Sequence, residues 1–306
     1  MKKKTIMKLM FTFATGLIAT TASAQDVVSK LEVFDIETGR HTVVARFDRR
    51  IEAPNWSRDG KWLIFNSDGR ILRMAADGST KADTIDTGFC VNCNNDHVLS
   101  TDGTMLAVSC SPKVDWRSRI YTLPLSGGTP TLITPVGPSY LHGWSPDGKT
   151  LTYCAERNGE YDVYTIPAEG GDEVRLTTAK GLDDGPEYSP DGRHIWFNSV
   201  RTGLMQLWRM NADGSNQTQM TFDEDMNSWF GHVSPNGKWV VYVAYHKGDL
   251  KPDQHLPNKN VELRLMPAAG GKPKTLVKLF GGQGTLNVNS WAPDSRRFAY
   301  VSYELK

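Results

Sequence analysis

The chain has 306 residues, of which 39% are hydrophobic and 10% are aromatic, and its formal net charge is +1. This composition is typical of a folded protein with a core, and it argues against a disordered chain or a strongly basic surface for nucleic acid. The 28 Gly and 16 Pro residues favour many short elements joined by turns. We therefore expect an all-β protein.

The first 24 residues have the pattern of a secretory signal peptide. Four lysines precede an apolar run over residues 9–19, and Ala22-Ser23-Ala24 is a small-residue cleavage site. Cleavage after Ala24 would leave 282 residues with 31 Lys and Arg against 34 Asp and Glu. We expect a periplasmic or secreted protein with one domain over residues 25–306, no membrane span and no affinity for nucleic acid.

A motif of an aromatic residue followed by Ser-Pro-Asp-Gly-Lys recurs along the remaining chain. It is complete at residues 144–149, and close variants have their second residue at positions 57, 100, 189, 234 and 292. Successive copies lie 43, 45, 44, 45 and 58 residues apart, which is close to the length of a four-stranded propeller blade. The Asp-Gly pair predicts a tight hairpin turn, because glycine readily adopts positive φ.

Each motif is followed by a hydrophobic strand and then by a second hairpin that ends in Ala-Asp-Gly-Ser or Gly-Gly. These hairpins are predicted at 71–79, 120–128, 163–171, 207–215 and 263–271. One more hairpin, at 31–47, precedes the first motif, and the last motif has a single strand after it. The hairpin at one end and the single strand at the other are complementary halves of one blade. The sequence therefore predicts a six-bladed β-propeller of four-stranded antiparallel blades, whose last blade pairs 31–47 with 286–304 and leaves no free edge.

The Trp-Ser-Pro-Asp-Gly-Lys cores and the Gly-Gly hairpins resemble the WD-type repeats of the TolB propeller family over residues 27–306. The resemblance implies a six-bladed propeller without the N-terminal α/β domain that TolB itself carries. The propeller is also similar, more distantly, to oligogalacturonate lyases, in which histidines and a glutamine hold a metal ion in the channel. Here Gln283 is followed by Asn287 and Asn289 where that family has histidines.

The loops that enter the innermost strands, and the loops between the second and third strands, are expected to surround one mouth of the central channel. Binding residues of propellers usually lie in such loops. Trp229 is expected there as an exposed stacking platform. The candidate ligand-binding residues are His97, His142, Arg157, Asp184, Glu187, Arg201, Trp229, His232, Gln283, Asn287 and Asn289.

Each candidate also has a structural alternative. The histidines are equally suited to hydrogen bonds between blades or with channel water. Arg157 and Arg201 could bind a carboxylate or phosphate with both guanidinium nitrogens. The stronger alternative is a solvated side chain or one paired with an acid of the next blade, supplied by Asp183 and Asp184. The insertion at residues 246–260 is expected to project over the mouth, as a lid, a partner-contact loop or a decorative loop.

A divalent metal at the mouth is a further alternative. His97, His142, His232 and Glu187 would suit Zn²⁺ or Mn²⁺, and Ca²⁺ is also considered. His232 sits one residue before the aromatic position of its motif and the other two histidines sit two before it, which points their side chains to opposite sides of a strand. No cofactor is therefore firmly predicted.

Four cysteines, Cys90, Cys93, Cys110 and Cys154, are expected near the same face. Export favours a disulfide between Cys110 and either Cys90 or Cys93. A structural zinc held by Cys90, Cys93, His97 and Cys110 is the alternative.

Two functions from different classes fit these features. The first is a monomeric, non-catalytic scaffold or binding protein that takes an envelope protein or an oligosaccharide at the channel mouth, and the absence of a complete catalytic motif favours it. The second is a metal-dependent lyase similar to oligogalacturonate lyase, in which Arg157 or Arg201 would bind the carboxylate of a uronate.

Overall fold

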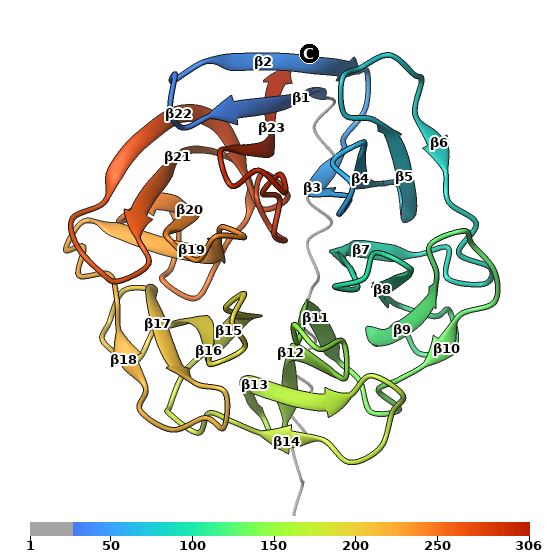
Figure 1. Ribbon diagram of the computed structural model, residues 1–306. Coiled ribbons are helices and arrows are strands. Elements are labelled where there is room, and N and C mark those ends of the chain that lie inside the picture. The colour runs from blue at the N-terminus through green and yellow to red at the C-terminus, as the bar shows by residue number, and fades with distance from the viewer. Residues whose placement is uncertain (1–26) are drawn as a thin grey trace, which may run out of the picture.

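The six copies of the repeat form six antiparallel sheets arranged in a ring around a central channel (Figure 1). The computed structural model describes residues 27–306, so the expected signal peptide lies outside the described residues. Within this range the regular secondary structure consists of strands, and no helix long and apolar enough to cross a membrane is present. The predicted all-β six-bladed propeller is confirmed.

Five blades contain four strands each, numbered from the channel outward. Blade one is β3 (Glu52–Trp56), β4 (Trp62–Ser67), β5 (Arg70–Ala75) and β6 (Asp83–Thr84). Blade two is β7 (Cys93–Leu99), β8 (Met105–Cys110), β9 (Arg119–Pro124) and β10 (Thr131–Leu132). Blade three is β11 (Ser139–Trp144), β12 (Thr150–Arg157), β13 (Glu160–Pro167) and β14 (Val174–Arg175). Blade four is β15 (Asp183–Tyr188), β16 (His194–Ser199), β17 (Gln206–Asn211) and β18 (Thr218–Gln219). Blade five is β19 (Met226–Val233), β20 (Trp239–His246), β21 (Pro257–Pro267) and β22 (Lys274–Gly282).

The sixth blade joins the two ends of the described chain. Its strands are β23 (Arg297–Leu305), β1 (Val27–Asp35) and β2 (His41–Phe47), with β1 between the other two. β1 pairs with β23 without interruption, from Val27 opposite Leu305 to Asp35 opposite Arg297. The predicted closure is therefore confirmed. The innermost position of this blade holds no regular strand and is reduced to one bridge, between Trp291 and Phe298.

The repeated turn owes its shape to a serine and an aspartate. In blade three the Ser145 hydroxyl donates to Asp147 Oδ1 over 2.6 Å and accepts the backbone N–H of Thr150 over 2.9 Å. Asp147 Oδ1 also accepts the backbone N–H of Lys149, and Gly148 has a φ of 72°. Four other blades repeat this pattern, with Asn236 replacing the aspartate in blade five. The motif thus closes the hairpin between the first and second strands of a blade.

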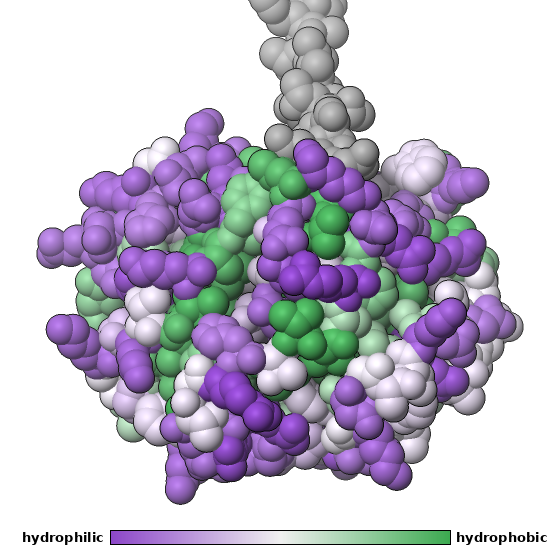
Figure 2. Space-filling view, turned by 90° about the horizontal axis from the view of Figure 1, so that it is seen from above, coloured by the Kyte–Doolittle hydropathy of each residue, from purple (hydrophilic) through white to green (hydrophobic). Residues whose placement is uncertain are grey.

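Apolar side chains pack between neighbouring blades, and polar ones cover much of the rim. The Trp144 indole donates to the carbonyl oxygen of Val98 in blade two, and the Trp291 indole donates to that of His232 in blade five. Figure 2 shows the rim with hydrophilic side chains in purple and strips of apolar ones in green between them. The rigid ring fixes the ends of the inner strands around the channel.

Candidate functional site: a cavity at the channel mouth

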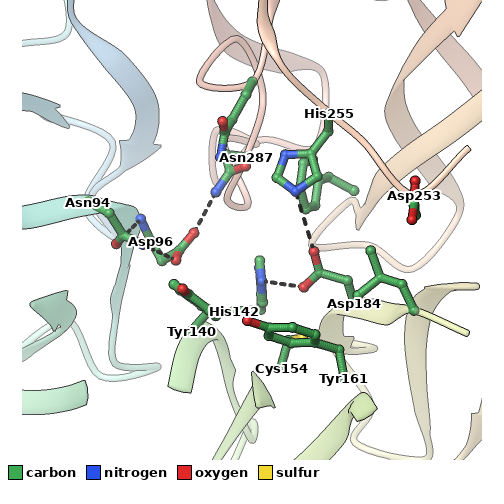
Figure 3. A pocket seen from close by; sticks show the side chains of 13 residues that line it. Asn94, Asp96, Tyr140, His142, Cys154, Tyr161, Asp184, Asp253, His255 and Asn287 are labelled. Carbon is green, nitrogen blue, oxygen red and sulfur yellow. Dashed lines mark hydrogen bonds and ion pairs between the residues drawn. The ribbon is translucent and has the colours of Figure 1, made fainter. Parts of the chain in front are cut away.

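A cavity of about 420 Å³ lies at the mouth of the channel where the inner strands begin. Side chains from blades two to five, from the insertion in blade five and from the segment before the last bridge line it (Figure 3). The lining residues are Asn94, Asp96, Tyr140, His142, Cys154, Tyr161, Leu182, Asp184, Phe230, Asp253, His255, Gln283 and Asn287. The expected location of the site, at the mouth formed by the entry loops, thus contains a cavity.

Asp184 and His142 form an ion pair on one side of this cavity. His142 Nε2 lies 3.1 Å from Asp184 Oδ1, and the other carboxylate oxygen lies 3.8 Å from His255 Nε2. Burial alone would raise the pKa of Asp184, but the hydrogen bond and the charge of His142, together with His255 and the Gly185 N–H, outweigh it and hold the pKa at about 2. Burial likewise opposes the charge on His142, and its bond with Asp184 raises the pKa above the usual value. The pair is therefore stabilised in its charged form.

Asp96 occupies the other side and has a different environment. Its side chain is buried, and its carboxylate accepts hydrogen bonds from the amide groups of Asn94, over 2.6 Å, and Asn287, over 2.7 Å (Figure 3). Burial raises its pKa to about 6, although His142 acts in the opposite direction. Asp96 and Asp184 consequently differ strongly in proton affinity.

A β-bulge in each of the five inner strands sets which side chains reach the cavity. In blade four the register of β15 shifts between Asp184 and Glu187, and Gly185 at the bulge has a φ of 61°. A Cβ on Gly185 would come within 2.6 Å of the Asn198 amide, so the bulge requires glycine here. Asp184 Oδ1 accepts the Gly185 N–H over 2.7 Å. The bulge and this bond aim the carboxylate at His142.

The insertion in blade five covers part of the mouth, as expected. Asp253 and His255 line the cavity, and the His255 ring packs on Trp229 with 4.4 Å between centroids. His142 stacks on Phe230 at 5.7 Å. Trp229 is fully buried beneath these groups, so the expectation of an exposed platform is wrong. The insertion supplies the ring that covers it.

Comparisons with known proteins agree on the family. The family model of the TolB β-propeller domain matches residues 138–265. An uncharacterised protein of Agrobacterium fabrum is 47% identical over 276 residues, covering 90% of this chain and 92% of that protein. The solved structure named "putative TolB" from Agrobacterium tumefaciens is 46% identical, covers 92% of this chain and 99% of that one, and superposes with a TM-score of 0.87. The chain belongs to the TolB-like β-propeller family.

More distant structures share the fold of this TolB-like propeller. TolB from Acinetobacter baumannii is 17% identical, with a TM-score of 0.59 over 92% of this chain and 77% of that one. An oligogalacturonate lyase from Vibrio parahaemolyticus is 14% identical, with a TM-score of 0.50 over 91% of this chain and 98% of that one. At this level of identity the likeness extends to the fold alone.

Four of the predicted site residues lie together at the cavity of the TolB-like propeller: His142, Asp184, Gln283 and Asn287. Sequence reasoning did not select Asp96, Tyr140 or Tyr161, although Asp96 directly precedes the selected His97. Consecutive residues of a strand point to opposite sides, so only one of the two could face the cavity. The structure places Asp96 at the cavity, and the register shift between Cys93 and His97 means that alternation along the sequence could not show which of the two it would be.

Other predicted residues are engaged between the blades. His97 is fully buried with Nε2 3.4 Å from the carbonyl oxygen of Ile64, and burial lowers its pKa to about 4. Glu187 accepts hydrogen bonds from Asn289 Nδ2 over 2.6 Å and from the backbone of Val233 over 3.1 Å. Its second oxygen lies 2.7 Å from His232 Nδ1. Glu187, His232 and Asn289 thus join blades four, five and six.

The expected metal ligands therefore do not form one site. Glu187 and His232 are paired with each other, and His97 faces a backbone carbonyl of blade one. Among residues 27–306, no group of three His, Cys, Asp or Glu side chains is placed to hold a metal ion. These side chains do not fit the divalent ion considered from the sequence, because His97, His142, His232 and Glu187 each bind another group of the protein.

Both predicted arginines form ion pairs within their own blades. Arg157 binds Glu173 with two bonds of 2.7 Å, and Arg201 binds Asp183 over 2.7 Å. Both arginines are therefore paired with acids, as the structural alternative predicted, but the acids belong to the same blade and not to the next one. Arg201 pairs with the predicted Asp183, and Arg157 pairs with Glu173, which was not predicted. Neither guanidinium lines the cavity.

The four cysteines are buried free thiols. Cys93 lies directly opposite Cys110 across β7 and β8, and the Cys93 thiol donates to the carbonyl oxygen of Cys90 over 3.3 Å. Cys90, Cys93 and Cys110 share one core cluster, whereas Cys154 lines the cavity. The expected disulfide between Cys110 and Cys90 or Cys93 is not formed. The fourth ligand of the alternative zinc site, His97, is directed at Ile64 instead.

Proposed function

We propose that this TolB-like propeller is an exported, non-catalytic protein that binds an envelope protein or an oligosaccharide at the channel mouth. The cavity supports this proposal most directly. Its volume of about 420 Å³ is that of a small-ligand or side-chain pocket, and a few polar groups converge on it within an aromatic wall. Such an arrangement suits recognition, since the ring holds each group in a fixed position.

The state of the titratable groups favours binding over catalysis. Burial raises the pKa of the Cys154 thiol well above its usual value, which argues against a nucleophilic thiolate. His142 is held by Asp184. The lyase alternative has less support still, because Arg157 and Arg201 are paired with carboxylates and the metal ligands that it needs lie apart.

Site-specific photo-crosslinking in living cells tests this proposal. We would place a benzophenone side chain at Tyr140, which lines the cavity, and at Lys149, an exposed residue at the other end of the same blade. We expect a discrete adduct in the periplasmic fraction for position 140 and none for position 149. A parallel panel of envelope oligosaccharides, assayed by thermal shift, covers the saccharide alternative.

Two results would contradict the proposal. One is an identical adduct pattern at both positions, which would indicate collision rather than recognition. The other is the absence of adducts at position 140 together with no thermal shift by any oligosaccharide.

A further inference from the structure

We propose that the cavity binds a cationic group that carries N–H donors, a primary ammonium or a guanidinium, between Asp96 and Asp184. This inference rests on the proposed function, because it names the ligand chemistry of the same site. It is carried by two independent observations, the charge of the lining and an unpaired buried acceptor.

The first observation is that the lining carries three aspartates and neither lysine nor arginine. Asp184 has a cationic partner in His142, but the hydrogen bonds to the Asp96 carboxylate come from neutral amides. A buried carboxylate without a positively charged partner is costly, and a cation in the cavity would offset that cost. The site therefore lacks the positive charge that the ligand would bring.

The second observation concerns the amide of Asn287, which is 1% exposed. Its nitrogen faces two oxygens, Asp96 Oδ1 at 2.7 Å and Asn95 Oδ1 at 3.4 Å, and this fixes the orientation of the amide. The amide oxygen then has no hydrogen-bond partner within the described chain. An unpaired buried acceptor costs about 1–3 kcal/mol, so a ligand N–H would be stabilised at this position.

The geometry and the walls of the cavity favour an organic cation over a metal ion. Figure 3 shows Asp96 beside the Asn287 amide on one side and Asp184 with His142 and His255 on the other. Tyr140 and Tyr161, with rings 6.5 Å apart, complete the wall, and aromatic faces attract ammonium and guanidinium groups. A metal ion would need several carboxylate or imidazole ligands around one point, and no such group of three occurs in residues 27–306.

Calorimetric titration of the purified protein with small amines in EDTA tests the inference. The cationic probes are N-acetyl-lysinamide, N-acetyl-argininamide and 1,4-diaminobutane, and the neutral control is N-acetyl-norleucinamide. We expect at least one cation to bind ten times more tightly than the control. If 1,4-diaminobutane binds more tightly than the two cationic amino-acid amides, the ligand is a free amine. If N-acetyl-lysinamide or N-acetyl-argininamide binds more tightly than the diamine, the ligand is a basic side chain of a partner.

Variants locate the binding within the cavity. Asp96→Asn keeps the shape and removes the charge, and we expect it to weaken binding of the cation by about 10- to 100-fold, as for a lost charge-assisted hydrogen bond. Asp213→Asn, in an exposed turn between β17 and β18, is the matched control and should bind as the unaltered protein does. Asn287→Ala is a second test if Asp96→Asn does not fold, and it should also weaken binding.

Three outcomes would overturn the inference: equal affinity for the neutral control, no binding of any cation, or equal binding by Asp96→Asn. Binding of Ca²⁺ alone, tested without EDTA, would overturn it too. If position 140 still crosslinks a partner while the cations fail, the proposed function stands and only this ligand class is excluded. If both fail, the channel mouth is not the binding site.

Discussion

The buried carboxylates of the channel show how neighbouring atoms decide the chemistry of identical groups. Asp184 has an imidazole beside it and its pKa is held at about 2, whereas Asp96 has only neutral amides and its pKa rises to about 6. Both carboxylate oxygens of Glu187 bind side chains of other blades, His232 and Asn289. Asp96 combines a carboxylate in the cavity wall with hydrogen bonds from neutral amides, and the proposed ligand site is centred on it for this reason.

A fourth carboxylate, Glu52 of blade one, supports a prediction about pH. Burial raises its pKa to about 7, with Asp96 and Asp68 adding to the effect and Arg50 opposing it. Since the unfolded chain ionises this group near its usual pKa of 4.5, the folded state binds the proton more tightly. The free energy of unfolding should therefore be highest below pH 4.5 for this contribution, and should fall as the pH rises through 7.

Glu52→Gln cannot ionise and should lose this dependence. We expect the stability of the variant, relative to the unaltered protein, to increase by about 3 kcal/mol between pH 4 and pH 8, since one pKa unit corresponds to about 1.4 kcal/mol. Urea unfolding at a series of pH values measures the difference. Glu160→Gln, at an exposed position, serves as the control, and its difference in stability from the unaltered protein should not change with pH. The same independence of pH for Glu52→Gln would contradict the prediction.

At the scale of single elements, the repeated turn is a second place where one side chain has a definite role. The Ser145 hydroxyl bridges Asp147 and the N–H of Thr150, and both bonds vanish in Ser145→Ala. We expect this variant to lose about 1–2 kcal/mol of stability in urea unfolding, because the partly buried N–H of Thr150 loses its acceptor. Ser126→Ala, in the exposed turn between β9 and β10, should change stability by less than about 0.5 kcal/mol. Equal losses of stability in Ser145→Ala and Ser126→Ala would indicate a general effect of replacing serine by alanine in a turn, and would contradict a role for the Ser145 hydrogen bonds.

The inner strands also explain why the fold could be predicted more completely than the site. Spacing and turn residues depend on local chemistry, so the motif at Trp144 and its variants predicted the blades. The direction of a side chain depends on strict alternation, and a bulge interrupts it in each of β3, β7, β11, β15 and β19. Selecting residues by their position before the aromatic residue of each motif therefore led to Glu187 and His97, which lie between blades, and it overlooked Asp96. Nor could sequence alone pair Arg157 with Glu173.

At the scale of the whole molecule, closure of the ring depends on contacts between residues more than 250 positions apart. β1 and β23 pair along their full lengths, and Phe34, Phe298 and Tyr300 join one core cluster. The complementary half-blades at the two ends predicted this pairing, but not the irregular inner segment. There, Gly282 and Gly284 have positive φ, and the segment turns toward the cavity with Gln283 and Asn287.

A ring closed in this way should tolerate new ends in a loop and not in an inner strand. Because Val27 lies opposite Leu305, a short linker can join residue 306 to residue 27, and new ends can be opened between Asn158 and Gly159 in an exposed hairpin. We expect this permutant to unfold cooperatively with a Tm within about 5 °C of residues 27–306, since moving one loop changes little closure entropy. Opening the chain between the buried Leu141 and His142 of β11 should abolish folding. Equal melting of both permutants, or failure of the first to fold, would show that tolerance to new ends does not depend on whether they lie in a loop or in an inner strand.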